Sequence, residues 1–184
     1  MVSPESSGAP VIVLIGPMGA GKSSVGKRVA KALGLRFTDT DSVIAQEHGP
    51  ITQIFERRGE AAFRLIEHDT VRRALGGGGV VAVGGGAPLH PGTRAALASL
   101  PVVLLDVADE AVAGRIRGQK RPLLNREDRD PVEEWVRIRE ERRPVYESVA
   151  TVRLDTSGRP MQAVVDEIVA WARGEGIVPG AREE

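Results

Sequence analysis

The chain of 184 residues contains no cysteine. This absence excludes a disulfide framework, a thiolate metal site and a cysteine nucleophile, and it fits a reducing compartment. We therefore expect a cytoplasmic protein without a role in redox chemistry.

An excess of charge of either sign is also missing, because Lys+Arg and Asp+Glu both number 25. A chain without a net positive field has no general means of recruiting nucleic acid or an anionic membrane. We expect neither as a partner, and any basic function must come from a local group of residues.

Long hydrophobic runs are absent too. The longest apolar stretches, such as 11–15 and 102–105, are far shorter than the roughly 20 residues that span a bilayer.

Residues 1–10 lack the basic and apolar regions of a secretory signal, and we expect them to form a flexible arm. Residues 174–184 are rich in Gly, Pro and charge, and we expect a flexible tail there.

The rest of the sequence has the composition of a soluble globular protein, with 41% hydrophobic and 27% charged residues. Its length suits a single hydrophobic core, so we predict one domain over 11–173 and expect a monomer.

Short apolar runs alternate with amphipathic segments along this domain. Such alternation requires crossover connections, so we predict a three-layer αβα fold with a five-stranded parallel sheet and ligands at the C-terminal strand ends. Residues 76–79 are four glycines that we interpret as a flexible connector. The predicted strands cover 11–15, 35–38, 80–83, 102–107 and 152–155, and the predicted helices cover 25–33, 41–48, 60–75, 91–99, 109–117, 131–146 and 160–173. The apolar run 11–15 predicts a strand buried on both faces. Gly34 suits the position after the first helix, and Asp130, before a proline, suits the N-cap of the helix at 131–146.

The glycine-rich segment Gly16-Pro-Met-Gly-Ala-Gly-Lys22-Ser23 follows the first predicted strand and opens the first predicted helix. Its spacing directs backbone N–H groups at phosphate oxygens, at the positive end of a helix. Lys22 would reach the β- and γ-phosphates as a catalytic cation, and the Ser23 hydroxyl would ligate Mg²⁺. The predicted ATP-binding residues of this loop are Gly16, Gly19, Ala20, Gly21, Lys22, Ser23 and Ser24.

A phosphate loop alone does not separate a small-molecule kinase from a switch GTPase or a mechanical ATPase. Asp39 and Asp41 follow the second predicted strand at i, i+2, so both side chains point the same way if the strand continues. One carboxylate could hold hydrated magnesium while the other engages an acceptor hydroxyl. Alternatively, Asp41 only caps the helix that begins near Ser42.

Further motifs follow the phosphate loop along the chain. They are Phe37-Thr-Asp39-Thr-Asp41, Ile54-Phe55, Gly59-Glu-Ala-Ala-Phe63-Arg64-x-x-Glu67, Gly84-Gly85-Gly86, Arg121-Pro122-Leu123-Leu124 and Arg142-Arg-Pro144-Val-Tyr146. No Asn-Lys-x-Asp guanine motif is present, which disfavours a GTPase. With these motifs in this order, the chain resembles the shikimate kinases over residues 11–172. The resemblance implies the nucleoside-monophosphate-kinase-like P-loop fold and MgATP-dependent phosphorylation of the 3-hydroxyl of shikimate, a step in aromatic amino-acid biosynthesis.

The resemblance also implies roles on the acceptor side, within a substrate-binding region at about 39–70 and beyond it. Arg64 and Arg142 match carboxylate-binding arginines, and guanidinium forks suit a planar carboxylate. Asp41 would bind ring hydroxyls and act as the base, while Asp39 would hold magnesium through water. The amides of Gly84, Gly85 and Gly86 would approach the substrate.

On the donor side, the resemblance implies two more arginines. Arg121 would be a catalytic, ATP-contacting arginine in a lid over about 118–130, which neutralises phosphate charge and excludes water. Arg159 would contact the adenine ring.

Alternatives exist for single residues and for the whole chain. Ion pairs with Glu60 and Glu67, at i−4 and i+3, could alone explain Arg64. Arg142 has no acidic residue one turn back, and Pro144 is expected to break its helix. The alternatives for the whole chain are another small-molecule kinase, such as a gluconate kinase, or a nucleotide-binding regulator without turnover.

Overall fold

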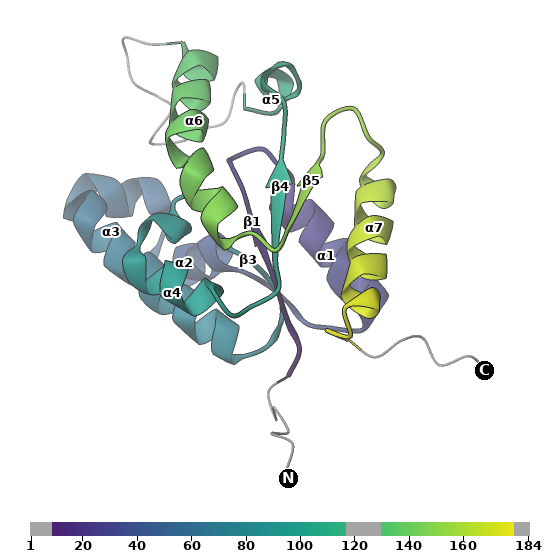
Figure 1. The fold of residues 1–184 in the computed structure, drawn as a ribbon. Coiled ribbons are helices and arrows are strands. Elements are labelled where there is room, and N and C mark those ends of the chain that lie inside the picture. The colour runs from purple at the N-terminus through teal and green to yellow at the C-terminus, as the bar shows by residue number, and fades with distance from the viewer. Residues whose placement is uncertain (1–8, 117–129, 179–184) are drawn as a thin grey trace.

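The structure is a computed structural model that describes residues 9–116 and 130–178. Figure 1 shows a central sheet between two layers of helices, which confirms the predicted αβα architecture. All five strands are parallel and lie in the order β2-β3-β1-β4-β5. The strands are β1 (Val11–Ile15), β2 (Phe37–Asp39), β3 (Gly79–Ala82), β4 (Val102–Asp106) and β5 (Val152–Asp155).

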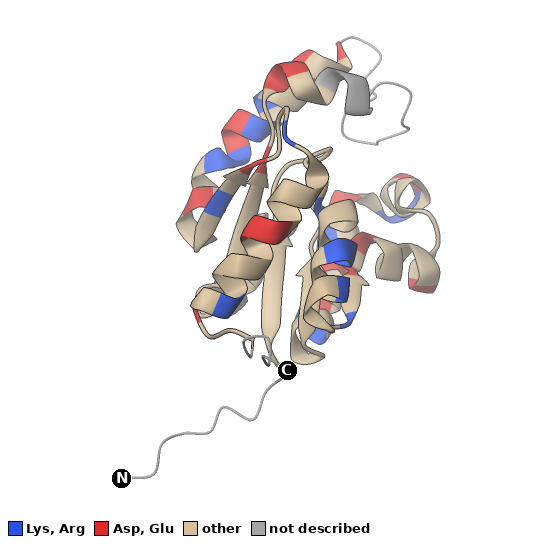
Figure 2. Ribbon diagram, turned by 90° about the vertical axis from the view of Figure 1, so that its right-hand side faces the viewer, with Lys and Arg blue, Asp and Glu red and all other residues tan. Residues whose placement is uncertain are grey.

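Seven α-helices and one 3₁₀ turn are present in the described part of the chain. None of these helices is both long and apolar enough to cross a membrane. Basic and acidic side chains are interspersed over the helices (Figure 2). The helices are α1 (Lys22–Leu33), α2 (Thr40–His48), α3 (Ile51–Gly76), η1 (Ala87–Leu89), α4 (Pro91–Leu97), α5 (Asp109–Ile116), α6 (Pro131–Val149) and α7 (Met161–Gly174).

The sheet is apolar on both faces, as its continuous hydrophobic runs require. Ile12 and Leu14 of β1 pack in the cluster that contains residues of α1 and α7. Val13 and Ile15 point the other way, into the cluster with α3 and α4. Helix α6 contributes to both clusters, because Trp135 lies in the first and Tyr146 in the second.

Two helices differ from the sequence prediction. Helical structure in α3 begins at Ile51 instead of residue 60, with a kink at Gly59, where φ is 77° and ψ is 169°. The apolar residues before the kink are buried against α2, which the sequence pattern around Gly59 did not reveal. The prediction that Pro144 breaks its helix is wrong, because α6 continues through it to Val149. A proline removes one N–H donor, and the buried face of α6 outweighs that loss.

The glycine run ends α3 and begins β3, so only its two middle residues connect these elements. Gly77 donates its N–H to the carbonyl of Ala74 at 3.1 Å, and Gly78 donates its N–H to the carbonyl of Leu75 at 3.2 Å, so both residues cap α3 and are held in place. Gly79 begins β3 opposite Val11 of β1 and has a φ of 90°, a conformation that favours glycine.

Helices α3 and α4 meet at two stacked imidazoles. The ring centroids of His68 and His90 are 4.0 Å apart, with 21° between the ring planes. His90 Nδ1 accepts the N–H of Gly92 at 3.2 Å and thereby caps α4, so this nitrogen is unprotonated. His68 Nδ1 lies 2.9 Å from the buried Thr93 hydroxyl.

We expect His68 to make the protein less stable in mild acid. Burial lowers the pKa of His68, and His90 and Arg72 lower it further against the opposing effect of Asp69. The unfolded chain therefore binds more protons as the pH falls through about 6.5, so folding stability is lost in that range. Urea unfolding at about pH 7.5 and about pH 5.5 measures this loss.

The matched variant for this test is His68→Gln, because Gln keeps polar atoms at this position but does not titrate. It should lose less stability between the two pH values than the parent protein. An equal loss in both proteins would show that His68 does not sense pH.

Candidate active site

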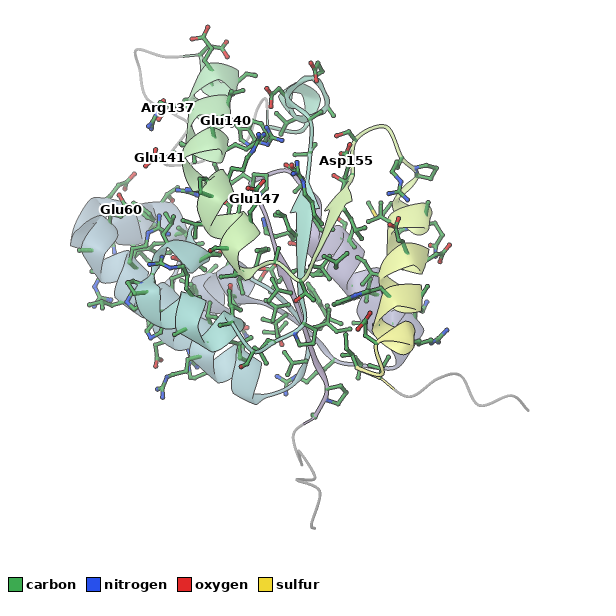
Figure 3. The ribbon with its side chains drawn as sticks, viewed as in Figure 1. Glu60, Arg137, Glu140, Glu141, Glu147 and Asp155 are labelled. Atoms are coloured by element: carbon green, nitrogen blue, oxygen red, sulfur yellow. The ribbon has the colours of Figure 1, made fainter. Side chains whose placement is uncertain are left out.

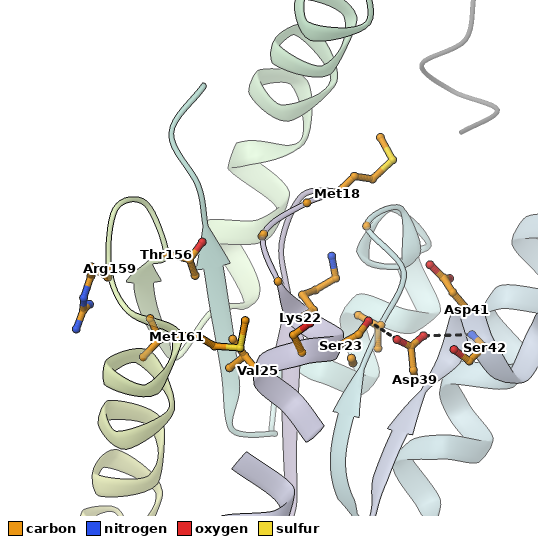
Figure 4. Close-up of a pocket in the computed structure, with 18 of the residues that line it drawn as sticks. Met18, Lys22, Ser23, Val25, Asp39, Asp41, Ser42, Thr156, Arg159 and Met161 are labelled. Carbon is orange, nitrogen blue, oxygen red and sulfur yellow. Dashed lines mark hydrogen bonds between the residues drawn. The ribbon is translucent and has the colours of Figure 1, made fainter. Parts of the chain in front are cut away.

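A cavity of about 810 Å³ opens at the C-terminal ends of the strands, in front of the N-terminus of α1 (Figure 4). This volume is within the range of cofactor and substrate sites. The cavity gathers most of the predicted ATP-binding loop, both predicted carboxylates and one of the three predicted glycines. Of the residues predicted from sequence, it is lined by Gly19, Ala20, Gly21, Lys22, Ser23, Ser24, Asp39, Asp41, Gly85 and Arg159.

The glycine-rich loop has the backbone that a phosphate cradle needs. Gly21 precedes α1 in the left-handed region, with φ of 92°. Gly16 packs so closely on β4 that an added Cβ would lie 2.1 Å from the carbonyl oxygen of Leu105. The ammonium of Lys22 donates to the carbonyl oxygens of Gly16 (2.8 Å) and Pro17 (3.0 Å) and so folds back over the loop.

Asp39 joins the phosphate loop to α2. Its carboxylate accepts the hydroxyl of Ser23 and, at 3.1 Å, the backbone N–H of Ser42 (Figure 4). Asp39 is therefore the N-cap of α2, and the alternative that Asp41 caps this helix is wrong. Asp41 instead lies in the first turn of α2, and its side chain lines the cavity.

The donor set around Ser23 and Asp39 fits magnesium. No group of three or more His, Asp or Glu side chains able to hold a metal occurs in the described residues. Mg²⁺ usually keeps several waters and binds through one or two carboxylates together with substrate phosphates. One hydroxyl and one carboxylate beside a phosphate loop match this usual coordination of Mg²⁺.

The glycine triplet separates the cavity from a buried charged cluster. A Cβ on Gly84 would lie 2.6 Å from Oδ1 of Asp41 and 2.6 Å from Oε1 of Glu67, so only glycine fits there. Gly84 also donates its N–H to the buried hydroxyl of Thr40, which fixes the triplet against α2. A Cβ on Gly86 would meet Nη1 of Arg64 at 2.1 Å.

Arg64 makes both ion pairs that its spacing predicts. Its Nη1 donates to Glu67 at 2.6 Å and its Nη2 donates to Glu60 at 3.0 Å. Its guanidinium also lies over the ring of Phe63, 5.3 Å from the centroid. Arg64 is therefore held beside Gly86 by acidic partners and does not line the cavity itself.

Glu67 is the centre of this cluster and is only 2% exposed. Burial raises the pKa of its carboxyl group, the Arg64 guanidinium opposes that effect, Asp41 raises the pKa further and Arg142 lowers it. Glu67 thus couples the carboxylate at the cavity to both predicted arginines. The sequence marked Glu67 as an ion-pair partner but gave no sign of its burial.

Helix α6 brings three side chains to the site. Arg142 is 8% exposed, and its Nη1 would lie 3.7 Å from a Cβ on Gly85. The hydroxyl of Tyr146 donates to the carbonyl oxygen of Gly85 at 2.6 Å. Trp135 donates its indole N–H to the carbonyl oxygen of Met18, in the phosphate loop, at 2.9 Å.

Sequence reasoning did not assign a role to Trp135 or Tyr146. Their spacing with Ile138 and Arg142, one helical face at i, i+3, i+7 and i+11, was the available signal.

The two remaining predicted arginines are Arg159 and Arg121. Arg159 lines the opposite end of the cavity from Asp41, near Thr156 and Met161 (Figure 4), and its guanidinium pairs with Glu167 at 2.6 Å. Arg121 and the predicted lid, apart from Asp130, lie outside the described residues. Asp130 caps α6 as predicted, because its carboxylate accepts the N–H of Val132 at 2.7 Å.

A phosphate loop at the head of α1, beside two carboxylates and the charged cluster around Glu67, defines a P-loop kinase. The chain matches the family model described as "Shikimate kinase" over residues 18–173. It is 47% identical to a shikimate kinase of Mycobacterium avium over 88% of this chain and 93% of the relative. It is 43% identical to one of Corynebacterium efficiens, covering 87% of this chain and 95% of the relative. The chain therefore belongs to the shikimate kinase family.

Solved structures agree with this assignment. The shikimate kinase of Acinetobacter baumannii, in complex with shikimate, matches with a TM-score of 0.85 and 32% identity over 91% of this chain and 95% of that chain. A gluconokinase of Sinorhizobium meliloti reaches a TM-score of 0.51 at 24% identity, covering 89% of this chain and 90% of that one, which shows a shared fold alone. The gluconate kinase alternative is thus not favoured.

Proposed function

We propose that this chain transfers the γ-phosphoryl group of ATP to the 3-hydroxyl of shikimate. The observation that carries the proposal is the cluster of Asp41, Glu67, Arg64 and Arg142 around the glycine triplet, next to the phosphate-loop cavity, in which Glu67 and Arg142 are buried. A polyol carboxylate needs a carboxylate for its hydroxyls and guanidinium groups for its anion, and this cluster offers both.

On the donor side, the loop amides and the N-terminus of α1 bind the phosphates. Lys22 exchanges its contacts with the carbonyls of Gly16 and Pro17 for the β- and γ-phosphate oxygens. Ser23 and Asp39, whose side chains are hydrogen-bonded to each other, would hold magnesium, Ser23 directly and Asp39 through water. Magnesium, when bound, supplies positive charge that offsets the charge on the phosphates. Arg121 is proposed, from the family resemblance, to neutralise the charge on the transferring group.

On the acceptor side, Asp41 accepts the proton of the 3-hydroxyl as that oxygen bonds to the γ-phosphorus. The bond from the γ-phosphorus to the bridging oxygen breaks, and ADP leaves with the electron pair. Arg64 and Arg142 bind the carboxylate of shikimate. The amides of Gly85 and Gly86 remain as backbone donors, because Gly84 donates to Thr40.

Arg159, which lines the far end of the cavity, is proposed to contact the adenine ring. Release from Glu167 would free its planar guanidinium to stack on the base. The apolar side chains of Val25, Met161 and Val164 line the same region and suit an aromatic ring.

The first test is an acceptor assay. Purified protein with MgATP should release ADP in proportion to added shikimate, with one ADP formed per phosphorylated shikimate. Gluconate at the same concentration should give no more ADP than ATP alone. ADP release that does not depend on shikimate would overturn the proposal, and release with gluconate would restore the gluconate kinase alternative.

A further inference from the structure

Helix α6 contacts the two halves of the site through opposite ends of one face. Near its N-terminus, Trp135 is 1% exposed and donates its N–H to the carbonyl oxygen of Met18 in the phosphate loop, at 2.9 Å. Near its C-terminus, Tyr146 is 2% exposed and donates its hydroxyl to the carbonyl oxygen of Gly85 in the acceptor loop, at 2.6 Å. Both loops are thus hydrogen-bonded to the same rigid element.

The middle of the same face is fixed to the sheet. Arg139 makes a two-pronged contact with Asp106 at the end of β4, with Nε and Nη2 each 3.0 Å from a carboxylate oxygen. Its guanidinium also lies over the ring of Trp135, 5.7 Å from the centroid. A bidentate, nearly buried pair allows little rotation of the helix about its axis.

The other side of α6 carries different residues. Arg137 and Glu141 project away from β4 (Figure 3) and pair with each other at 3.0 Å. The residues of α6 that contact the two loops therefore all lie on its one buried face.

We propose that α6 sets the separation between the phosphate donor loop and the acceptor loop, with Trp135 and Tyr146 as positioning residues for the transfer. The inference rests on the proposed function, because it takes the glycine triplet as the acceptor loop. Neither side chain touches the reacting atoms. Each holds a backbone carbonyl so that the neighbouring amides face the ligand.

The physical basis is the short distance over which phosphoryl transfer works. The reacting atoms must approach to about 3–3.5 Å in line, so a small shift of one loop relative to the other lowers the rate. A single intramolecular hydrogen bond contributes about 0.5–1.5 kcal/mol, which corresponds to about 2- to 12-fold in an equilibrium constant. Burial raises the pKa of Tyr146, so its hydroxyl keeps the proton that it donates to Gly85.

The test compares two variants that each remove one donor but keep an aromatic ring, Tyr146→Phe and Trp135→Phe. Tyr146→Phe should raise KM for shikimate by about 2- to 12-fold and leave KM for ATP within about twofold of the parent value. Trp135→Phe should show the reverse pattern. Both should lower kcat, because both relax the separation of the loops.

Thr93→Val is the control, since it removes another buried hydroxyl, bonded to His68, outside the site. It should lower the urea midpoint without changing either KM. If Tyr146→Phe and Trp135→Phe behave like this control, they are only structural and the inference is overturned. If one variant does not fold, the split between the two KM values in the other still decides the outcome.

The two proposals fail in different ways. Parent protein that does not phosphorylate shikimate would overturn the proposed function and this inference with it. Active parent protein, together with variants whose KM values are unchanged, would overturn the inference alone.

Discussion

Asp41→Asn is expected to lower kcat by about 10²- to 10⁴-fold, the usual contribution of a general base. The amide keeps the size of the side chain in the first turn of α2 but cannot take the proton of the acceptor hydroxyl. ATP affinity should stay near the parent value, because the phosphate loop and Asp39 are unchanged. Steady-state kinetics with shikimate, together with a nucleotide titration, measure both quantities.

The control for this substitution is Asp69→Asn on α3, where an exposed carboxylate pairs with Arg72 and Arg73 outside the cavity. It should leave kcat unchanged. Asp41→Asn protein that keeps more than half of the parent kcat would remove Asp41 from the mechanism.

Arg64→Met should produce the largest change in stability. It removes the ion-pair partner of Glu67, whose side chain is 3% exposed, and breaking one side of a buried pair costs about 3–5 kcal/mol. The nearby Arg142 still lowers the pKa of Glu67, so we expect the lower end of this range. KM for shikimate should rise as well, since the carboxylate of the substrate loses one guanidinium.

The pH dependence of this variant is also predictable. Burial raises the pKa of the Glu67 carboxyl group, so the folded protein binds a proton there more tightly than the unfolded chain does. The free energy of unfolding therefore falls as the pH rises above the pKa that Glu67 has in the unfolded chain. Without Arg64 this pKa rises further. The stability that Arg64→Met loses relative to the parent protein should therefore be greater at about pH 8 than at about pH 5. Urea unfolding at the two pH values measures the difference.

The double variant Arg64→Met/Glu67→Leu separates stability from binding. Replacing both partners with apolar side chains should recover most of the lost stability but not the affinity for shikimate. If Arg64→Met instead unfolds at the parent urea concentration with an unchanged KM, then Arg64 is neither a structural nor a binding residue. Recovery of shikimate affinity in the double variant would show that Arg64 acts only through Glu67.

Local patterns in the sequence predicted much of the fold. The run Val11–Ile15 predicted a strand buried on both sides, and Gly34 was expected to end the first helix. The structure confirms both, and Gly34 caps α1 with a φ of 66°. Asp130 was likewise recognised as a cap from its position before a proline. Both caps depend on interactions between residues within a few positions of one another, and the strand was visible because its apolar residues are contiguous in the sequence.

Other predictions failed because distant contacts outweighed a local rule. Pro144 was expected to break the regular helix at 131–146, yet α6 continues to Val149 and Tyr146 donates to Gly85 of the glycine triplet. The third helix was predicted to begin at residue 60, yet Ile54, in the helical segment before Gly59, is buried beside Ile44 of α2. The capping carboxylate of α2 proved to be Asp39, because the strand ends before the position where Asp41 could act.

The sequence by itself determined the nature of the donor site, because a phosphate loop is a contiguous motif whose spacing specifies its backbone. It also determined the family, because the order of the motifs along the chain can be compared without knowing which residues they contact. Only the tertiary structure decided how the acceptor side is assembled. Glu67, Trp135 and Tyr146 act through partners between 3 and 117 positions away, and the burial that gives these contacts their strength exists only after α3, α6 and the sheet have packed together.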